Sequence, residues 1–129
     1  MKRILIILGA GIVIVFICFV LIANLWIGNT VEKNIEIAKK QYQGTAEDAL
    51  IAFLLDTANS PRDRTHIAIW TLGQIQSEKA KPVLRELYKN DPEGKTCSGK
   101  HDSVLCQYEI YKALNAETEN WWPLHRKLN

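Results

Sequence analysis

The first apolar stretch of the chain is one continuous run. Residues 4–27 are apolar except for Asn24. A helix rises about 1.5 Å per residue, so this run spans about 36 Å, slightly more than the hydrocarbon core of a bilayer. Cleavable secretory signals have shorter apolar stretches followed by a small-x-small site, which is not evident here. We therefore predict an uncleaved transmembrane signal anchor over residues 1–28, with residues 4–27 in contact with the lipid bilayer.

The orientation of this span follows from the basic residues that flank it. Lys2 and Arg3 precede the run, whereas Lys33 and the Lys39-Lys40 pair follow it. A short basic tail before a first apolar segment usually stays in the cytoplasm. We predict a cytoplasmic N-terminus and a periplasmic or extracellular C-terminal domain, with insertion the other way as the alternative. Gly9 and Gly11 would let the span pack closely against other membrane helices.

Beyond Asn29 the apolar residues recur at helical spacing between short polar turns, with no alternating strand pattern. The predicted fold class is therefore all-α. Residues 29–44 form the first segment, a juxtamembrane helix that can continue the membrane helix and ends at Gly44. Its apolar positions are Val31, Ile35, Ala38 and Tyr42.

Two helices with clear start signals follow. Thr45 and Asp48 resemble a capping box for a helix over residues 46–57. Its predicted buried positions are Ala49, Leu50, Phe53 and Leu54. Ser60 and Pro61 then begin a helix that should run to Gln74 or Ile75. Its predicted buried face holds Ala68, Ile69, Leu72 and Ile75.

The remaining helices have weaker signals. Ser77 can cap a helix that has Pro82 near its first turn and Val83, Leu84 and Leu87 as its buried stripe. Residues 90–94 form a turn. A last long helix should open at Asp102 or Ser103, and Asn115 is a plausible left-handed terminator. That helix would carry Leu105, Ile110, Ala113 and Leu114.

Several of these segments resemble HEAT-like repeats of the phycobilisome-lyase type. Residues 65–75, with Ala68 and Gly73, are similar to the first helix of such a repeat, and residues 77–87 are similar to its second helix. Residues 108–115 look like the first helix of a following unit. The resemblance implies a short α-solenoid of antiparallel helix pairs over residues 45–129, and the fold hosts many tasks, so it implies no lyase activity here.

The chain departs from the repeat pattern in two places. The arginine usual near the start of the first helix falls at Thr65, while Arg64 stands one position earlier. The matching positions Gly73 and Asn115 are 42 residues apart, longer than the repeat period, because a loop with Cys97 is inserted. In the usual pattern, Gly73 and Ala68 would allow two helices to approach closely.

Length and charge limit the possible functions. The 129-residue chain leaves about a hundred residues after the span, enough for one small domain but not for a multidomain enzyme. All 14 acidic residues follow Ile27, and of the 16 Lys and Arg only Lys2 and Arg3 precede it, so the segment after the span is formally neutral. That balance gives no reason to expect nucleic acid as a partner.

Cys97 and Cys106 are the cysteines outside the membrane run. On the exported side of a membrane such a pair is typical of a disulfide, which would tie the loop to the last helix. The alternative is a metal site formed by these cysteines with His101, and with His125 as a further ligand. Two free thiols are the third possibility, if the domain is cytoplasmic.

The exposed tryptophans are the candidate binding residues. Trp121 and Trp122 can either cap the last helix or anchor a partner, and Trp70 is a second anchor candidate. The sequence has no nucleophile elbow, phosphate loop or HExxH motif, so we expect no catalytic residues, cofactor or metal. The predicted function is a non-catalytic, membrane-anchored interaction module that serves as an accessory, assembly or scaffold subunit. The alternative is a metal-binding protein or enzyme centred on Cys97, His101 and Cys106.

Overall fold

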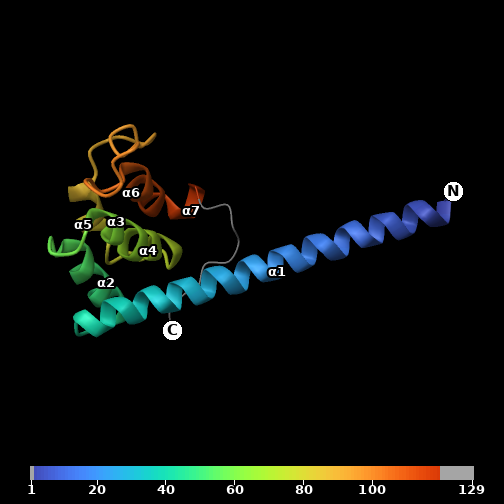
Figure 1. The fold of residues 1–129 in the computed structure, drawn as a ribbon, viewed down its shortest axis with the longest axis horizontal. Helices are drawn as coiled ribbons and strands as arrows, with labels where there is room; N and C mark the ends of the chain where they lie inside the picture. The colour runs from blue at the N-terminus through green and yellow to red at the C-terminus, as the bar shows by residue number, and fades with distance from the viewer. Residues whose placement is uncertain (1, 120–129) are drawn as a thin grey trace. The chain divides into compact units, whose positions relative to one another are not determined.

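The structure is a computed structural model that describes the backbone from Lys2 to Glu119 and the side chains from Gly9 to Thr118. Every regular element in that range is helical, as the hydrophobic pattern predicts (Figure 1). The chain divides into two compact units, residues 1–30 and the part from Val31 onward. The elements are α1 Lys2–Gln41, α2 Ala46–Leu55, α3 Pro61–Asp63, the π-helix η1 Arg64–Ile69, α4 Trp70–Gln74, α5 Lys81–Leu87, α6 Gln107–Leu114 and α7 Ala116–Glu119.

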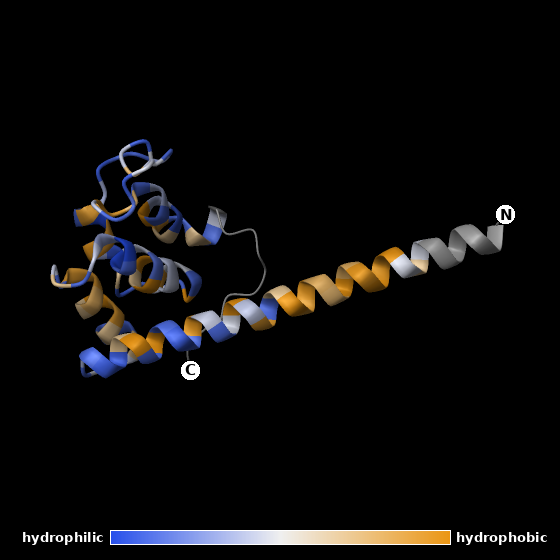
Figure 2. Ribbon diagram, viewed as in Figure 1, coloured by the Kyte–Doolittle hydropathy of each residue, from blue (hydrophilic) through white to orange (hydrophobic). Residues whose placement is uncertain are grey.

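The first unit consists of the apolar part of α1. This helix is long and apolar enough to cross a membrane, and its hydrophobic part stands out in Figure 2. Its large apolar side chains between Ile12 and Trp26 are mostly exposed. The polar side chains near the end of the run bond to carbonyls of their own helix. Asn24 Nδ2 donates to the Val20 carbonyl at 3.2 Å, and Thr30 Oγ1 donates to the Trp26 carbonyl at 2.8 Å. Both polar groups are thus satisfied without a partner from another element.

The last turns of α1 belong to the second unit. Val31, Asn34 and Ala38 are buried at helical spacing, so one face of this segment packs into the domain. The segment predicted as a juxtamembrane helix is therefore the end of α1, and it stops at Gln41. Gly44 then adopts a φ of +120°, a backbone conformation that favours glycine.

Helix α2 follows its prediction closely at its start. Thr45 and Asp48 form the capping box, and the predicted apolar positions are all buried. The helix ends at Leu55, two residues before the predicted end, and Asp56 is extended with its N–H bonded to the Ala52 carbonyl. Its apolar face packs against η1.

The predicted helix from Pro61 to Gln74 is present, but its middle is a π-helix. Ser60 caps its start, with its side chain accepting the N–H of Asp63. In η1 the N–H of Trp70 bonds to the carbonyl of Thr65, five residues back. A π-turn holds one residue more than an α-turn, so the flanking parts α3 and α4 are separated by an additional residue.

The close approach predicted for Gly73 occurs against α6. A Cβ at Gly73 would lie 3.1 Å from both Cα and Cβ of Ala113, closer than side chains normally pack. Helix α6 contacts both α4 and α5, and α6 is the main helical neighbour of α5. Leu72 and Leu84 are both buried, whereas Val83 and Leu87 of the predicted stripe are only half-buried.

The predicted start of the fourth helix is wrong. Ser77 Oγ does accept an N–H, that of Ala80 at 3.2 Å, but it caps the turn before the helix. Helix α5 begins at Lys81, with Pro82 in its first turn. Gln76, with a φ of +50°, lies in the turn between α4 and α5.

The predicted start of the last long helix is also wrong, whereas its predicted end at Asn115 is correct in position but not in conformation. Residues before Cys106 form turns, and α6 begins at Gln107, so Leu105 lies outside it. The N–H of Cys106 bonds to Thr65 Oγ1 at 3.2 Å, a long-range contact that fixes this residue in extended backbone. At the other end Asn115 has a φ of −110°, not a left-handed conformation, and its Nδ2 donates to the Tyr111 carbonyl at 2.8 Å.

Candidate functional site

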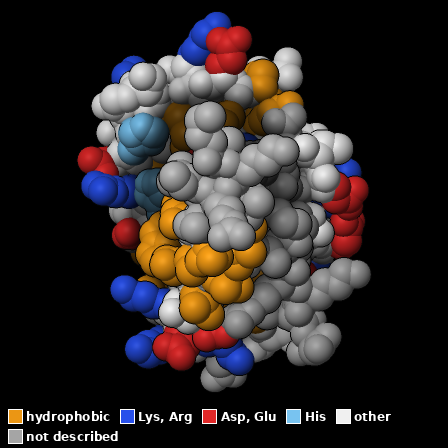
Figure 3. Space-filling model, turned by 90° about the vertical axis from the view of Figure 1, so that its right-hand side faces the viewer, with side chains coloured by type: hydrophobic (Ala, Val, Ile, Leu, Met, Phe, Trp, Pro, Cys, Tyr) orange, Lys and Arg blue, Asp and Glu red, His pale blue; other side chains and the backbone are white. Residues whose placement is uncertain are grey.

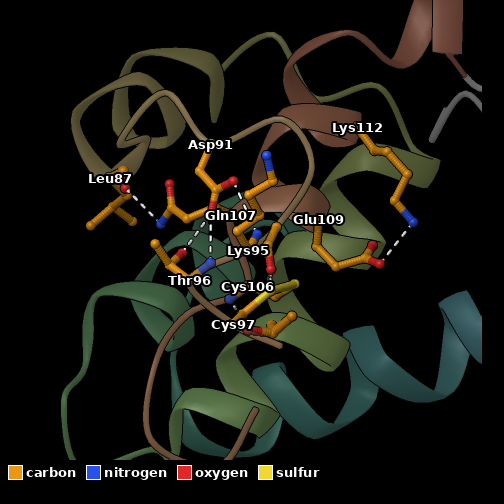
Figure 4. Close-up of a disulfide and its surroundings, with 11 residues drawn as sticks. Leu87, Asp91, Lys95, Thr96, Cys97, Cys106, Gln107, Glu109 and Lys112 are labelled. Carbon is orange, nitrogen blue, oxygen red and sulfur yellow. Dashed lines mark hydrogen bonds and ion pairs between the residues drawn. A yellow bond between two sulfur atoms is a disulfide. The ribbon is translucent and has the colours of Figure 1, made fainter. Parts of the chain in front are cut away.

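The loop that holds Cys97 is organised by Asp91. One carboxylate oxygen accepts the N–H of Lys95 at 3.0 Å, and the other accepts both the N–H of Thr96 at 2.8 Å and its hydroxyl at 2.7 Å (Figure 4). The bonds from Thr96 stabilise the carboxylate, so the pKa of Asp91 lies below its usual range. Gly94, with a φ of +65°, completes the turn that leads to Cys97.

Cys97 and Cys106 lie at disulfide-bonding distance. Their Cα atoms are 5.0 Å apart, a usual separation for a disulfide. Both are buried, with 2% and 5% of their surfaces exposed. Because the N–H of Cys106 is bonded to Thr65 in η1, the pair connects the long loop to the π-helix.

Gln107 fixes the start of α6 to the end of α5. Its side chain is 4% exposed and bonds to the backbone at both ends. Its Nε2 donates to the Leu87 carbonyl at 3.3 Å, and its Oε1 accepts the N–H of Lys89 at 2.6 Å (Figure 4). The residue next to Cys106 is therefore held from two sides, and the position of this cysteine is set by tertiary contacts.

His101 completes a cluster of three potential metal-ligand side chains. One donor atom from each of Cys97, His101 and Cys106 lies within 4.8 Å of the others. The structure thus brings together the three central members of the metal-site alternative, whereas His125 lies outside the described residues. His101 is exposed, while both sulfur atoms are in the interior.

An open hollow lies in front of His101. It measures about 430 Å³ and is lined by Arg62, His66, Gly99, His101 and Asp102. Arg62 Nη1 and Asp102 Oδ1 are 3.5 Å apart, and both side chains are largely exposed, so their ion pair is weak. Histidine side chains also reach the surface beside charged residues in Figure 3. His101 therefore lies between the buried sulfur pair and the open hollow.

The candidate binding residues have different placements. Trp70 begins α4 and is half-buried, beside Glu109 and Lys112 of α6. Lys112 Nζ and Glu109 Oε1 form an ion pair at 2.7 Å. Trp121 and Trp122 lie outside the described residues. At Gly9 and Gly11 of α1, no side chain in the described part of the chain lies within 4 Å of the place a Cβ would occupy.

Sequence reasoning also missed three polar contacts away from the cysteine loop. Arg64 Nε donates to the Leu54 carbonyl at 2.6 Å at the end of α2. Asn34 Nδ2 donates to Thr71 Oγ1 at 2.9 Å and to the His66 carbonyl at 3.3 Å. The one-position offset of Arg64 was the available signal for the first contact. A polar residue on the apolar face of the juxtamembrane segment was the signal for the second.

The third missed contact joins the start of α2 to the turn before α5. Lys79 forms an ion pair and hydrogen bond with Asp48, and the Ser77 hydroxyl donates to Glu47. The contact with Lys79 is the main reason that the pKa of Asp48 falls to about 2, and the Thr45 hydroxyl contributes. Residues 47 and 48 thus contact the turn that precedes α5.

Comparison of the chain with protein-family models, with curated proteins and with solved structures finds no match. The class of the protein accordingly rests on its own features. Within the described residues it is an all-helical chain with one apolar helix that could span a membrane and a cysteine pair at disulfide-bonding distance.

Proposed function

We propose that this chain is a single-pass membrane protein whose helical domain binds another protein. It would serve as a non-catalytic accessory, assembly or scaffold subunit of a membrane or envelope complex. The observation that carries the proposal is α1, whose apolar part is long enough to cross a bilayer and whose last turns bury one face in a folded domain. One helix thus supplies both a membrane anchor and part of the domain it anchors.

The chemistry of the first unit supports a lipid environment. Large apolar side chains such as Phe16, Leu21 and Leu25 are more than half exposed on α1. Moving one such side chain from water into an apolar phase gains about 1.5–3 kcal/mol, so the helix as a whole strongly favours a bilayer. The backbone of a helix is satisfied internally, which permits this transfer.

Two features support a domain outside the cytoplasm. A cysteine pair at bonding distance favours a non-reducing compartment. Lys2 and Arg3, before the apolar run, favour a cytoplasmic N-terminus. We therefore place the domain in the periplasm or the extracellular space.

The contact made by Arg64 supports the HEAT-like interpretation of the domain. In the repeat pattern an arginine at position 65 would contact the turn after the preceding helix. Here Arg64 makes a contact of this kind, with the Leu54 carbonyl near the end of α2. The π-helix η1 contains one additional residue between this arginine and Leu72. One inserted residue accounts for the one-position offset. The side chains before and after the π-turn keep the directions they would have in an uninterrupted α-helix.

The surface of the domain fits recognition of a folded protein. Charged side chains of both signs lie on the surface (Figure 3), which suits a specific partner better than a polyanion. Trp70 is the described tryptophan candidate, and aromatic anchors of this kind often dominate interface energy. Anchoring to a membrane raises the local concentration of such a partner.

Photocrosslinking in native membranes tests the proposal. A photoreactive amino acid is placed at Trp70, Trp121 or Trp122 and, as a matched control, at Leu55, which is 51% exposed on α2. We expect a discrete protein adduct from at least one tryptophan position and none from the control. Equal adducts from all positions, or adducts with lipid alone, would contradict a specific protein interface.

A topology experiment tests the cellular side of the domain. Two reporters are fused in turn after Asn129, one active only in the cytoplasm and one active only outside it. We expect activity from the second. Activity from the cytoplasmic reporter alone would reverse the proposed orientation but leave the crosslinking result to be judged separately.

A further inference from the structure

We propose that the reduced form of the Cys97–Cys106 pair is a zinc site. Cys97 Sγ, Cys106 Sγ and one imidazole nitrogen of His101 would bind a single Zn²⁺, and water from the hollow would take the fourth position. The proposal is independent of the protein partner inferred above. In the oxidised form the two cysteines would be bonded to each other, and in the reduced form both would bind the metal ion.

The first argument is the geometry of the three donor atoms. They lie within 4.8 Å of one another. Zinc binds thiolate sulfur at about 2.3 Å and imidazole nitrogen at about 2.0 Å, so ligand atoms in a tetrahedral site are about 3.3–3.8 Å apart. The Cα atoms of the cysteines, 5.0 Å apart, can hold their sulfur atoms at that spacing once the disulfide is opened. The exposed His101 side chain is able to rotate toward them.

The second argument is the charge of the site. Burial raises the free-energy cost of an isolated thiolate, and both cysteines have at most 5% of their surfaces exposed. A pair of buried thiolates would therefore need a cation. Zn²⁺ neutralises two thiolates, and a neutral imidazole adds no charge, so the complete site has no net charge. This donor set is one that zinc readily accepts.

The third argument is access to the ion. A metal site needs an entry path, and His101 lines both the sulfur cluster and the open hollow. The hollow also supplies water for an open fourth position. Asp102, beside His101, is paired with Arg62 and does not belong to the three-donor cluster. His66 lines the same hollow without belonging to that cluster, which makes it a matched control.

The chemical steps balance in two stages. A dithiol reductant gives two electrons and two protons to the Cys97–Cys106 bond and is itself oxidised to a disulfide. Zn²⁺ then binds the two thiols as thiolates and releases two protons. In the oxidised form the sulfurs are bonded to one another and provide no thiolate, so zinc binding requires reduction.

The experiment uses the full chain in detergent with Cys18→Ser, which removes the free cysteine of α1. The protein is purified oxidised, reduced with a dithiol, freed of reductant without oxygen, and titrated with zinc. We expect one zinc per reduced chain and none per oxidised chain. Cobalt in place of zinc should give near-ultraviolet thiolate-to-metal absorption, and Cys106→Ser should abolish it.

Histidine variants separate the proposed site from unspecific thiol binding. His101→Asn should weaken zinc binding at least tenfold, and His66→Asn should leave it unchanged. Circular dichroism of each reduced variant shows whether its helices persist. The proposal is overturned if the reduced chain retains no zinc or if His101→Asn binds as well as the parent. It is also overturned if His66→Asn is equally damaging, or if a chain that has lost its helices binds zinc as tightly.

Discussion

The two sides of the π-helix η1 are held in different ways. On the side of α2, the domain depends on fully buried apolar residues from a helix with strong local signals, including Leu50 and Leu54. On the side of α6, the chain between residues 88 and 106 has no α-helix and is fixed by Asp91, Gln107 and the cysteine pair. Packing therefore stabilises the first side, whereas polar bonds and a crosslink position the second.

The largest expected effect comes from the packed side. Phe53 is 2% exposed and contacts the ring of Tyr42 edge-on, with ring centroids 6.1 Å apart. Phe53→Ala should lower the free energy of unfolding by about 3–5 kcal/mol, because it removes a large buried group and leaves a cavity. Denaturant unfolding of the full chain in detergent, followed by helical circular dichroism, measures the change. Leu55→Ala, at an exposed position of the same helix, is the control and should cost less than a third as much.

The crosslinked side should respond next. Replacing both Cys97 and Cys106 by serine removes a bridge with a sequence separation of 9. The closure of so short a ring predicts a loss of about 2–3 kcal/mol in unfolding free energy. Reduction of the parent protein under the same denaturant series should reproduce that loss in the absence of zinc. Equal unfolding midpoints for oxidised parent and serine variant would show that the crosslink contributes nothing to the domain's stability.

The contact between α4 and α6 gives a smaller effect. Gly73→Ala places a methyl group 3.1 Å from Ala113, so α4 and α6 must separate slightly. We expect a loss of about 1–3 kcal/mol, as for other overpacked sites. Adding Ala113→Gly should recover part of it, since the opposing methyl group is removed. A double variant less stable than either single variant would place the strain elsewhere.

The smallest expected effect concerns the ion pair between Asp48 and Lys79. The pKa of Asp48 is lowered to about 2, so its contribution to stability is fully present above its unfolded pKa of about 3.9. It is lost as the pH falls through the folded pKa. Asp48→Asn should therefore reduce the pH dependence of the unfolding midpoint between about pH 4 and pH 2. Between pH 5 and pH 7, the variant and the parent should show the same pH dependence. An unchanged acid profile would contradict this.

The packed side was the more predictable one from sequence. Thr45, Ser60 and Pro61 act within a few residues of their own position, so their helix starts were predicted correctly. Ser77 and Asn115 have the same local chemistry but serve other geometries, in a turn and in a side-chain cap. The start of α6 could not be predicted, because the bond from Cys106 to Thr65 spans 41 residues.

The candidate site was predictable in composition but not in arrangement. The sequence offered Cys97 and Cys106 as a disulfide pair or, with His101, as metal ligands, and the structure shows that the three donor atoms lie within 4.8 Å of one another. The hollow beside His101 is also lined by Arg62 of α3 and His66 of η1, which precede Gly99 and His101 of the same hollow by more than thirty residues. That meeting depends on how α6 packs on α4, which no local pattern specifies.

The π-helix has a consequence for how this gene can change length. Each residue added to an α-helix turns all later side chains by about 100°, so a deletion in a helix usually misdirects one flank. Within η1, loss of one codon would turn a wide turn into an ordinary one while Arg64 still faces α2 and Gly73 still faces α6. This segment is where the coding sequence should best tolerate shortening by a single amino acid.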